Sequence, residues 1–586
     1  MNAKAKISIG SQDFSYMREN QTFYIDKTSF ISEWWDNKDS VTLITRPRRF
    51  GKTLNLSMME SFFSKQYEGR GDLFEGLEIW KEEQYRQLQG TWPVVSISFA
   101  AIKGKTYRDT RDGFITVLQN LYQKHNYLLQ GSVLSETEKQ NYYTLGQYVE
   151  KNKDIKKEIS DNTIIWAINT LMSYMVRYYR KKVIVLLDEY DTPLQEAYIN
   201  GYWAELTALI RGMFNSTFKT NEYLYRSLLT GITRVSKESI FSDLNNLEVV
   251  TATSEKYCTA FGFTEDEVFD ALEARGLSCE KENIRRWYDG FIFGNKMDMY
   301  NPWSITLYLD SGKYKTYWAD TSSNRLVSEL IREGTAELKM QMEELLDGNC
   351  IEVVLDEQVI FEQLKKTKGA IWSLLLAGGY LKPVSCRFDP ETGRSIYHLQ
   401  ITNYETMLMF RNMIAGWFSE DLNAYSDFKK ALVQGDLNYM NRFMNEVAKV
   451  MFSSFDSGNK PSESAQPERF YHGFVLGLIV DLSDKYHIRS NRESGFGRYD
   501  VLMEPKTRDN DAIVMEFKVL DEYTEKTLED TVRNALRQIR EREYDTDLLA
   551  RGIPGERIRH YGFAFKGKTV LIGDGSVDRA NHVRLL

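Results

Sequence analysis

The sequence predicts an α/β protein in three parts: a parallel sheet over residues 1–265, a mainly helical middle over 266–455, and a second α/β domain over 456–586. In the first part, near-continuous apolar and β-branched runs alternate with long helical patterns, which is typical of parallel strands covered on both faces. In the last part, two alternating strands flank a short turn, which predicts a hairpin. A chain of 586 residues is also too long for one hydrophobic core, so several domains are expected.

Composition excludes several classes of protein. The formal net charge of −8 argues against a protein that coats nucleic acid by bulk charge, although a local basic groove stays open. The four cysteines lie far apart with no CxxC pair, so neither disulfides nor a structural zinc site are expected. No apolar run approaches the roughly 20 residues of a membrane-spanning helix, and the N-terminus lacks the apolar stretch of a secretory signal. We therefore expect a cytoplasmic protein without a membrane partner.

A strand, a loop and a helix follow one another near the N-terminus. Residues 41–45 form a short apolar run typical of a buried strand, and residues 54–63 have the apolar spacing of a helix. The loop between them, RPRRFGKT, matches the pattern GxxxxGK[ST] at Gly51, Lys52 and Thr53, with an arginine in place of the first glycine. This context is the one that a phosphate-binding loop requires.

Each matched residue of this loop offers a specific contact to a nucleoside triphosphate. Gly51 lets backbone N–H groups approach phosphate oxygens at the start of a helix. Lys52 would span the β- and γ-phosphates, and the Thr53 hydroxyl would bind Mg²⁺. Arg46 and Arg49 are further candidate nucleotide contacts. The letters GKT alone are weak evidence, because a basic surface turn has the same composition.

Three more apolar runs, at residues 92–100, 181–191 and 223–235, are predicted as strands of the same sheet. The second run ends in acids. Asp188 therefore lies where a magnesium ligand belongs, and Glu189 could polarise the attacking water. A single acid at a strand end is usually a solvated carboxylate, but both motifs together, in this order, predict that the chain binds ATP and Mg²⁺.

The run at residues 223–235 ends in small polar residues and an arginine. Thr230 or Thr233 could act as a polar sensor of the nucleotide, and Arg234 could contact the γ-phosphate. A threonine that merely terminates a strand would look the same.

The segments YIDKT, ITRPRRFGKT, VLLDEYDTPL, LLTGITRVSK and YNPWSI resemble the AAA-ATPase-like family of bacterial proteins over most of residues 5–310. An arginine at the first position of the loop is usual in that family. The resemblance implies that Asp26 and Lys27 lie near the nucleotide, and that the middle part is a helical lid that can include a winged-helix portion. Related P-loop ATPases often form rings or dimers, which leaves a homo-oligomer open.

The segment GRYDVLMEPKTRDNDAIVMEFKVL places two acids and a lysine on neighbouring strands of a hairpin. Glu516 and Lys518 are two positions apart on one strand and so point to the same face, which Asp500 on the other strand can reach. The two carboxylates could hold Mg²⁺ or Mn²⁺, and Lys518 could orient or help deprotonate a water, as hydrolysis of a phosphodiester requires. A structural ion pair would use the same residues.

The segments ERFYHGF, SNRESGFGRYD, MEFKV and ALRQI resemble the PD-(D/E)XK nuclease superfamily over about residues 465–570. The resemblance implies a restriction-endonuclease-like fold in which Glu468 and Gln538 support the metal or the water. Together the two resemblances predict an ATP-regulated, metal-dependent nuclease. Its substrate is expected to be nucleic acid, with DNA favoured over RNA. The alternative is a nucleotide-sensing switch or a nucleic-acid-binding scaffold with weak or absent catalysis.

Overall fold

The computed structural model describes most of the chain in two compact units. It covers residues 5–130, 132–146, 159–234, 240–241, 244–319, 325–332, 334–355, 369–391, 393–416, 422–451, 475, 479, 482, 485–494, 497–507, 510–521, 523–566 and 569–575. One unit comprises residues 1–327 and 350–407, and the other comprises residues 328–349 and 408–586. Within the described ranges, none of the helices has the length and apolar character that crossing a membrane would require.

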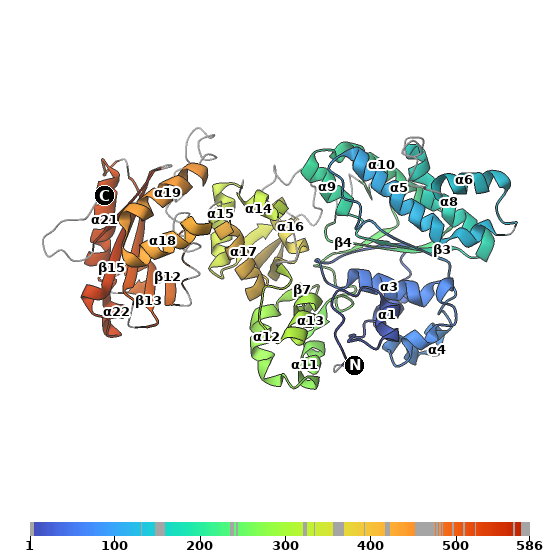
Figure 1. The fold of residues 1–586 in the computed structure, drawn as a ribbon, viewed down its shortest axis with the longest axis horizontal. Helices are drawn as coiled ribbons and strands as arrows, with labels where there is room; N and C mark the ends of the chain where they lie inside the picture. Colours follow the sequence, from blue (N-terminus) through green and yellow to red (C-terminus); the bar gives the residue numbers. More distant parts are fainter. Residues whose placement is uncertain are drawn as a thin grey trace. The chain divides into compact units, whose positions relative to one another are not determined.

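A five-stranded parallel sheet forms the centre of the N-terminal unit (Figure 1). Its strands, in spatial order, are β2 (Val94–Ser98), β3 (Val183–Asp188), β4 (Leu224–Gly231), β1 (Val41–Thr45) and β5 (Leu247–Val250). Every residue of β1 and β3 is buried, which explains their apolar sequences. The predicted parallel sheet is confirmed, and β4 lies between the strand before the phosphate loop and the strand that ends in acids.

Helices cover both faces of this sheet, as in other α/β folds (Figure 1). One face carries α1 (Phe14–Glu19), α3 (Lys52–Phe63) and α4 (Glu83–Arg86). α2 (Ser29–Asn37) shares a buried cluster with α3. The other face carries α5 (Tyr107–Lys124), α6 (Glu136–Gly146), α8 (Asp161–Tyr179), α9 (Thr192–Asn200) and α10 (Trp203–Phe218).

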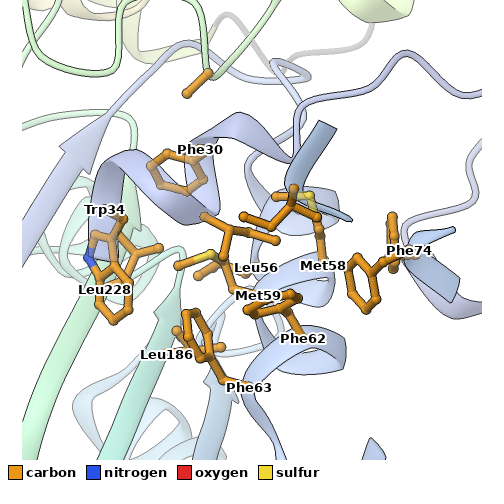
Figure 2. Packing of buried hydrophobic residues seen from close by; sticks show 14 of the residues in the cluster. Phe30, Trp34, Leu56, Met58, Met59, Phe62, Phe63, Phe74, Leu186 and Leu228 are labelled. Atoms are coloured by element: carbon orange, nitrogen blue, oxygen red, sulfur yellow. The ribbon is translucent and has the colours of Figure 1, made fainter. Parts of the chain in front are cut away.

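The core under α3 is rich in aromatic and sulfur-containing side chains (Figure 2). Met59 and Phe63 of α3 belong to one buried cluster with Trp34 of α2, Leu186 of β3 and Leu228 of β4. Burying one such side chain contributes about 1.5–3 kcal/mol. The helix that follows the phosphate loop is therefore anchored on the sheet along its length.

The middle of the chain combines helices with two small antiparallel sheets. The first sheet contains β6 (Phe263–Thr264), β8 (Lys296–Tyr300) and β7 (Phe291–Phe293), and the second contains β10 (Leu381–Asp389), β11 (Arg394–Ile401) and β9 (Ile351–Val354). The helices are α11 (Glu265–Ala274), α12 (Lys281–Tyr288), α13 (Pro302–Ser311), α14 (Arg325–Arg332), α15 (Ala336–Leu346), α16 (Ala370–Ala377) and α17 (Tyr404–Gly416). A mainly helical middle with few strands was expected, and the structure contains more strands. β6, β7 and β8 were missed because they have only two, three and five residues.

The C-terminal unit contains a second five-stranded sheet, which is mixed. Its spatial order is β12 (Tyr486–Ser494), β13 (Gly497–Pro505), β14 (Ala512–Val519), β15 (Ile558–Lys566) and β16 (Thr569–Asp574). Only the β14–β15 pair is parallel among these strands. The helices of this part are α18 (Leu422–Gln434), α19 (Leu437–Met451), α21 (Leu528–Glu541) and α22 (Thr546–Ala550).

Two separate cores stabilise the two faces of this second sheet. Met515 and Phe517 of β14 pack with residues of α18 and α19, whereas Val514 packs with residues of α21 on the opposite face. The alternation follows from the two-residue period of a strand. Both faces of β14 are therefore covered.

The last apolar run of the sequence, residues 560–573, contributes to two strands rather than one. These are the antiparallel strands β15 and β16, in which Lys566 pairs with Thr569. The chain thus reverses direction between these residues. Both strands are apolar, so the sequence pattern alone did not separate them.

Candidate nucleotide and nuclease sites

A cavity of about 530 Å³ opens beside the loop between β1 and α3. Gly51 immediately precedes α3 with a φ of 81°, in the left-handed region that favours glycine. The N–H groups at the start of α3 carry a partial positive charge, which attracts anions. The loop and helix-start residues that line the cavity are Arg48, Arg49, Phe50, Gly51, Lys52, Thr53, Leu54 and Asn55.

Lys52 is buried at this cavity and contacts the backbone of its own loop. Its Nζ donates hydrogen bonds to the carbonyl oxygens of Arg46, at 2.9 Å, and Pro47, at 2.7 Å. Burial lowers the pKa of Lys52, and the charge of Asp188 opposes this shift. The ammonium group is thus desolvated and partnered only by neutral carbonyls in these bonds, which suits it to bind an anion.

Asp188 connects three elements of the fold at the end of β3. The Thr53 hydroxyl of α3 donates to its Oδ2 at 2.6 Å, and the Thr230 hydroxyl of β4 donates to its Oδ1 at 2.6 Å. Burial raises the pKa of Asp188, and the two hydroxyl hydrogen bonds act in the opposite direction. Carboxylate and hydroxyl oxygens are the ligands that Mg²⁺ prefers, so this donor set fits that ion.

Glu189 follows directly and adopts a backbone conformation that is unusual for a side chain of its size. Its φ is 49°, and non-glycine residues in this region cost about 1–3 kcal/mol and concentrate at functional sites. The Thr192 hydroxyl donates to the Glu189 Oε2 at 3.0 Å. Both residues line the cavity, so the carboxylate is held by one hydrogen bond at a position accessible to a water.

In the C-terminal unit, Asp500 and Glu516 lie on neighbouring strands. Val501 of β13 pairs with Met515 of β14, which brings the preceding Asp500 next to Glu516. The backbone N–H of Phe517 donates to the Asp500 Oδ2 at 2.8 Å. The two residues are therefore direct cross-strand neighbours, and their side chains lie on the same face of the hairpin.

Lys518 and Gln538 complete this group of side chains. The Lys518 Nζ lies 3.9 Å from the Glu516 Oε1, and the Gln538 side-chain amide of α21 donates to the same oxygen. Glu516 is only 2% exposed, whereas the Lys518 side chain is 25% exposed. A buried carboxylate beside a partly accessible lysine is a chemically competent pair for metal-assisted hydrolysis.

The carboxylate oxygens of Asp500 and Glu516 are hard donors and fit Mg²⁺ or Mn²⁺. Among the residues described, no three His, Cys, Asp or Glu side chains converge in a way that could hold a metal. Glu468, the third predicted ligand, lies outside the described residues. The predicted metal role of Glu468 therefore stays a prediction.

Two family models match parts of the chain. Residues 8–241 match the family model described as Predicted AAA-ATPase, and residues 466–575 match that of the PD-(D/E)XK nuclease superfamily. The chain joins an AAA-ATPase-like domain to a nuclease-superfamily domain. An uncharacterized protein in the vnfD 5′ region of Azotobacter chroococcum mcd 1 is 26% identical over 379 residues, which are 63% of this chain. The matched region spans 65% of that relative's length.

In the AAA-ATPase-like domain, Arg46 is fully buried and holds the loop rather than lining the cavity. Its guanidinium donates to the carbonyl oxygens of Thr45 and Thr251, both at 2.9 Å, and lies 4.5 Å from the centre of the Phe293 ring. Burial lowers the pKa of Arg46 to about 10. The arginine at the first loop position thus contacts the backbone and does not line the cavity.

Asp26 and Lys27 occupy different environments in the AAA-ATPase-like domain. Lys27 lines the cavity and forms an ion pair with Glu267 at 2.7 Å. The Asp26 carboxylate accepts hydrogen bonds from Thr28 and from the backbone N–H of Glu78. Of the two residues, Lys27 is therefore the one with access to a ligand in the cavity.

Asp191 of the AAA-ATPase-like domain is a residue that sequence reasoning missed. Its Oδ2 accepts hydrogen bonds from the backbone N–H groups of Ile232, at 3.0 Å, and Thr233, at 2.8 Å, and from the Thr233 hydroxyl at 2.8 Å. It is 1% exposed, and burial raises its pKa. Asp191 thus ties the acid run after β3 to the segment after β4, just before the half-buried Arg234. Asp191 is the third acid of DEYD, and nothing in the sequence around it names its hydrogen-bond partners.

Proposed function

We propose that the AAA-ATPase-like domain binds and hydrolyses ATP with Mg²⁺, and that its nucleotide state controls metal-dependent cleavage of nucleic acid by the nuclease-superfamily domain. DNA is the expected substrate. The nuclease proposal is supported by the positions of Asp500, Glu516 and Lys518 on adjacent strands. The side-chain amide of Gln538 donates a hydrogen bond to the Glu516 carboxylate. These are the groups that phosphodiester hydrolysis needs.

At the ATP site, the roles follow from the positions of the side chains. Lys52 would exchange its two carbonyl partners for phosphate oxygens, because the ammonium group binds a charged phosphate oxygen more strongly than a neutral carbonyl oxygen. Thr53 and Asp188 would hold Mg²⁺, with Thr230 fixing the carboxylate. Glu189 would accept a proton from the water that attacks the γ-phosphate.

At the nuclease site, Asp500 and Glu516 would hold the metal ion. The Gln538 amide orients the Glu516 carboxylate, and Lys518 would orient the water and stabilise negative charge on the scissile phosphate. When bound, Mg²⁺ or Mn²⁺ would neutralise the charge that develops on the phosphate oxygens. Nucleic acid would thus be cut by water rather than through a covalent intermediate.

A cleavage assay with purified full-length protein tests the nuclease proposal. Plasmid, linear DNA, single-stranded DNA and RNA are incubated with Mg²⁺ or Mn²⁺, beside the variants Lys518→Ala and Lys506→Ala. Lys506 is an exposed lysine just after β13 and serves as the matched control. We expect cleavage of DNA by the wild type and by Lys506→Ala, and none by Lys518→Ala. Equal cleavage by wild type and Lys518→Ala under every condition would exclude the proposed site.

A second candidate function is a nucleotide-sensing switch or a nucleic-acid-binding scaffold with weak catalysis. Arg46 favours it, because a buried arginine replaces the first glycine of the loop and holds it by backbone contacts. This reading expects ATP binding and nucleic-acid binding without turnover of either. A homo-oligomer stays a separate proposal, which light scattering with and without ATP would test.

A further inference from the structure

Three consecutive residues of the phosphate loop contact a segment that lies beyond the matched AAA-ATPase-like region. Phe50 packs edge-on against Phe291 and Phe293, with ring centres 4.8 and 5.4 Å apart. Arg48 and Arg49 contact residues at and after the start of α13, as described next. The nucleotide site is therefore built in part by residues 291–318, outside residues 8–241.

The Arg48 carbonyl oxygen receives two hydrogen bonds from this segment. The indole N–H of Trp318 donates at 3.0 Å, and the side-chain amide of Asn301 donates at 3.3 Å. Asn301 also caps α13, since its Oδ1 accepts from the backbone N–H groups of Trp303 and Ser304. The same asparagine thus fixes the start of α13 and one carbonyl of the phosphate loop.

The Arg49 guanidinium lies over the indole ring of Trp303, 4.2 Å from the ring centre. Both residues line the cavity beside Lys52. Arg49 is exposed and has a φ of 62°, so its backbone is held in the left-handed region within the loop. A cation over a tryptophan face is attracted by the ring quadrupole. The ring therefore restricts a long, flexible side chain to the wall of the cavity.

We propose that Trp303 is a positioning residue for nucleotide binding: its ring holds the Arg49 guanidinium where a phosphate group of the nucleotide enters the cavity. This inference rests on the proposed binding of ATP. Preorganisation increases affinity because the side chain loses less freedom when the ligand binds. It also makes α13 a part of the site, although sequence motifs for phosphate binding contain no residue of this helix.

The aromatic face of Trp303 can be removed or kept by substitutions that break no hydrogen bond. Its indole N–H is buried and has no hydrogen-bond partner among the described residues, so Trp303→Phe keeps an aromatic face and removes no hydrogen bond. Trp303→Leu keeps apolar bulk but removes the aromatic face. Trp287 of α12 is the matched control, because it packs on Tyr314 and Tyr404 and does not line the cavity.

A double-mutant cycle on the full-length chain tests the proposal. The Kd for ATP with Mg²⁺ is measured by calorimetry for wild type, Lys52→Ala, Arg49→Ala, Trp303→Leu, Trp303→Phe, Trp287→Phe and the double variant Arg49→Ala/Trp303→Leu. We expect Trp303→Leu and Arg49→Ala each to weaken binding about tenfold, which corresponds to ~1.4 kcal/mol. The double variant should be no weaker than Arg49→Ala, and Trp303→Phe and Trp287→Phe should bind nearly as wild type does.

The outcomes separate this inference from the proposed function. If the wild type binds ATP no better than Lys52→Ala, ATP binding at this loop is refuted and the role of Trp303 with it. If ATP binds but Trp303→Leu keeps wild-type affinity, or the two losses add in the double variant, the positioning role alone is refuted. Thermal unfolding of each variant identifies any that fails to fold. If Trp303→Leu does not fold, Trp303→Met, which also lacks an aromatic face, replaces it in the cycle, and additive losses with Arg49→Ala again refute the role.

Discussion

Asp188, at the end of β3, and Asp191, just after it, accept hydrogen bonds from different elements although they lie within four residues of one another. Asp188 accepts hydrogen bonds from Thr53 and Thr230, and Asp191 accepts three from Ile232 and Thr233. Asp188 and Glu189 were predicted because they follow an apolar strand. Asp191 could not be predicted, because its partners lie about 40 residues later and meet it only through the β3–β4 pairing.

Glu189→Gln should separate ATP hydrolysis from ATP binding. The amide keeps an oxygen that can accept the hydrogen bond from Thr192 but no longer accepts a proton from water. Loss of a general base typically lowers the rate by about 10²–10⁴-fold. We expect phosphate release to fall by about that factor, with the Kd for ATP within about threefold of wild type. An unchanged rate of phosphate release would rule out Glu189 as the base.

Asp191→Ala should destabilise the N-terminal unit strongly. It leaves three buried donors without their acceptor, and each unsatisfied buried group costs about 1–3 kcal/mol. We expect the free energy of unfolding to fall by about 3 kcal/mol or more. Asp191→Asn retains an acceptor oxygen and should lose less than Asp191→Ala. Chemical denaturation measures both, and equal losses in the two variants would contradict a role through these hydrogen bonds.

At the scale of elements, the sequence predicted strands and helices best where burial is uniform. β1, β3 and β4 are almost wholly buried, and their apolar runs identified them. β5 is four residues long and mostly half-buried, so its pattern is weak and it was not predicted. Residues 263–319 likewise needed the structure, since the short hairpin of β7 and β8 is recognisable only from its pairing.

The junction between α12 and β7 should make stability depend on pH. Burial and the charge of Asp298 raise the pKa of Asp289 to about 7. In the unfolded chain this carboxyl ionises near pH 3.9, so the folded state binds the proton more tightly and stability falls as pH rises from about 4 to 7. Asp289→Asn removes this loss of stability. Because a shift of one pKa unit corresponds to about 1.4 kcal/mol, the loss amounts to at most about 4 kcal/mol.

The thermal midpoint of Asp289→Asn should therefore rise relative to wild type between about pH 4 and pH 7 and stay constantly higher above pH 7. Asp310→Asn, at an exposed carboxylate of α13, is the control and should show no such trend. A difference between Asp289→Asn and wild type that does not change with pH would mean that this carboxyl has no raised pKa.

At the scale of the whole molecule, the two sites belong to two compact units whose sequences are interleaved. The chain passes between the units at residues 327–328, 349–350 and 407–408. The first and last of these points lie within helices α14 and α17. Three covalent connections therefore join the two units. The sequence predicted both activities from local motifs but contains no motif for their coupling.

The most direct test of ATP-controlled cleavage is the rate of DNA cleavage with and without ATP. It is measured for wild type, Lys52→Ala and Glu189→Gln in the same Mg²⁺ buffer. We predict that ATP changes the cleavage rate of the wild type and that Lys52→Ala cleaves at the ATP-free rate in both conditions. With ATP present, Glu189→Gln should keep the cleavage rate of the ATP-bound state. A wild-type rate that is the same with and without ATP, while Lys518→Ala remains inactive, would show a nuclease that ATP does not control.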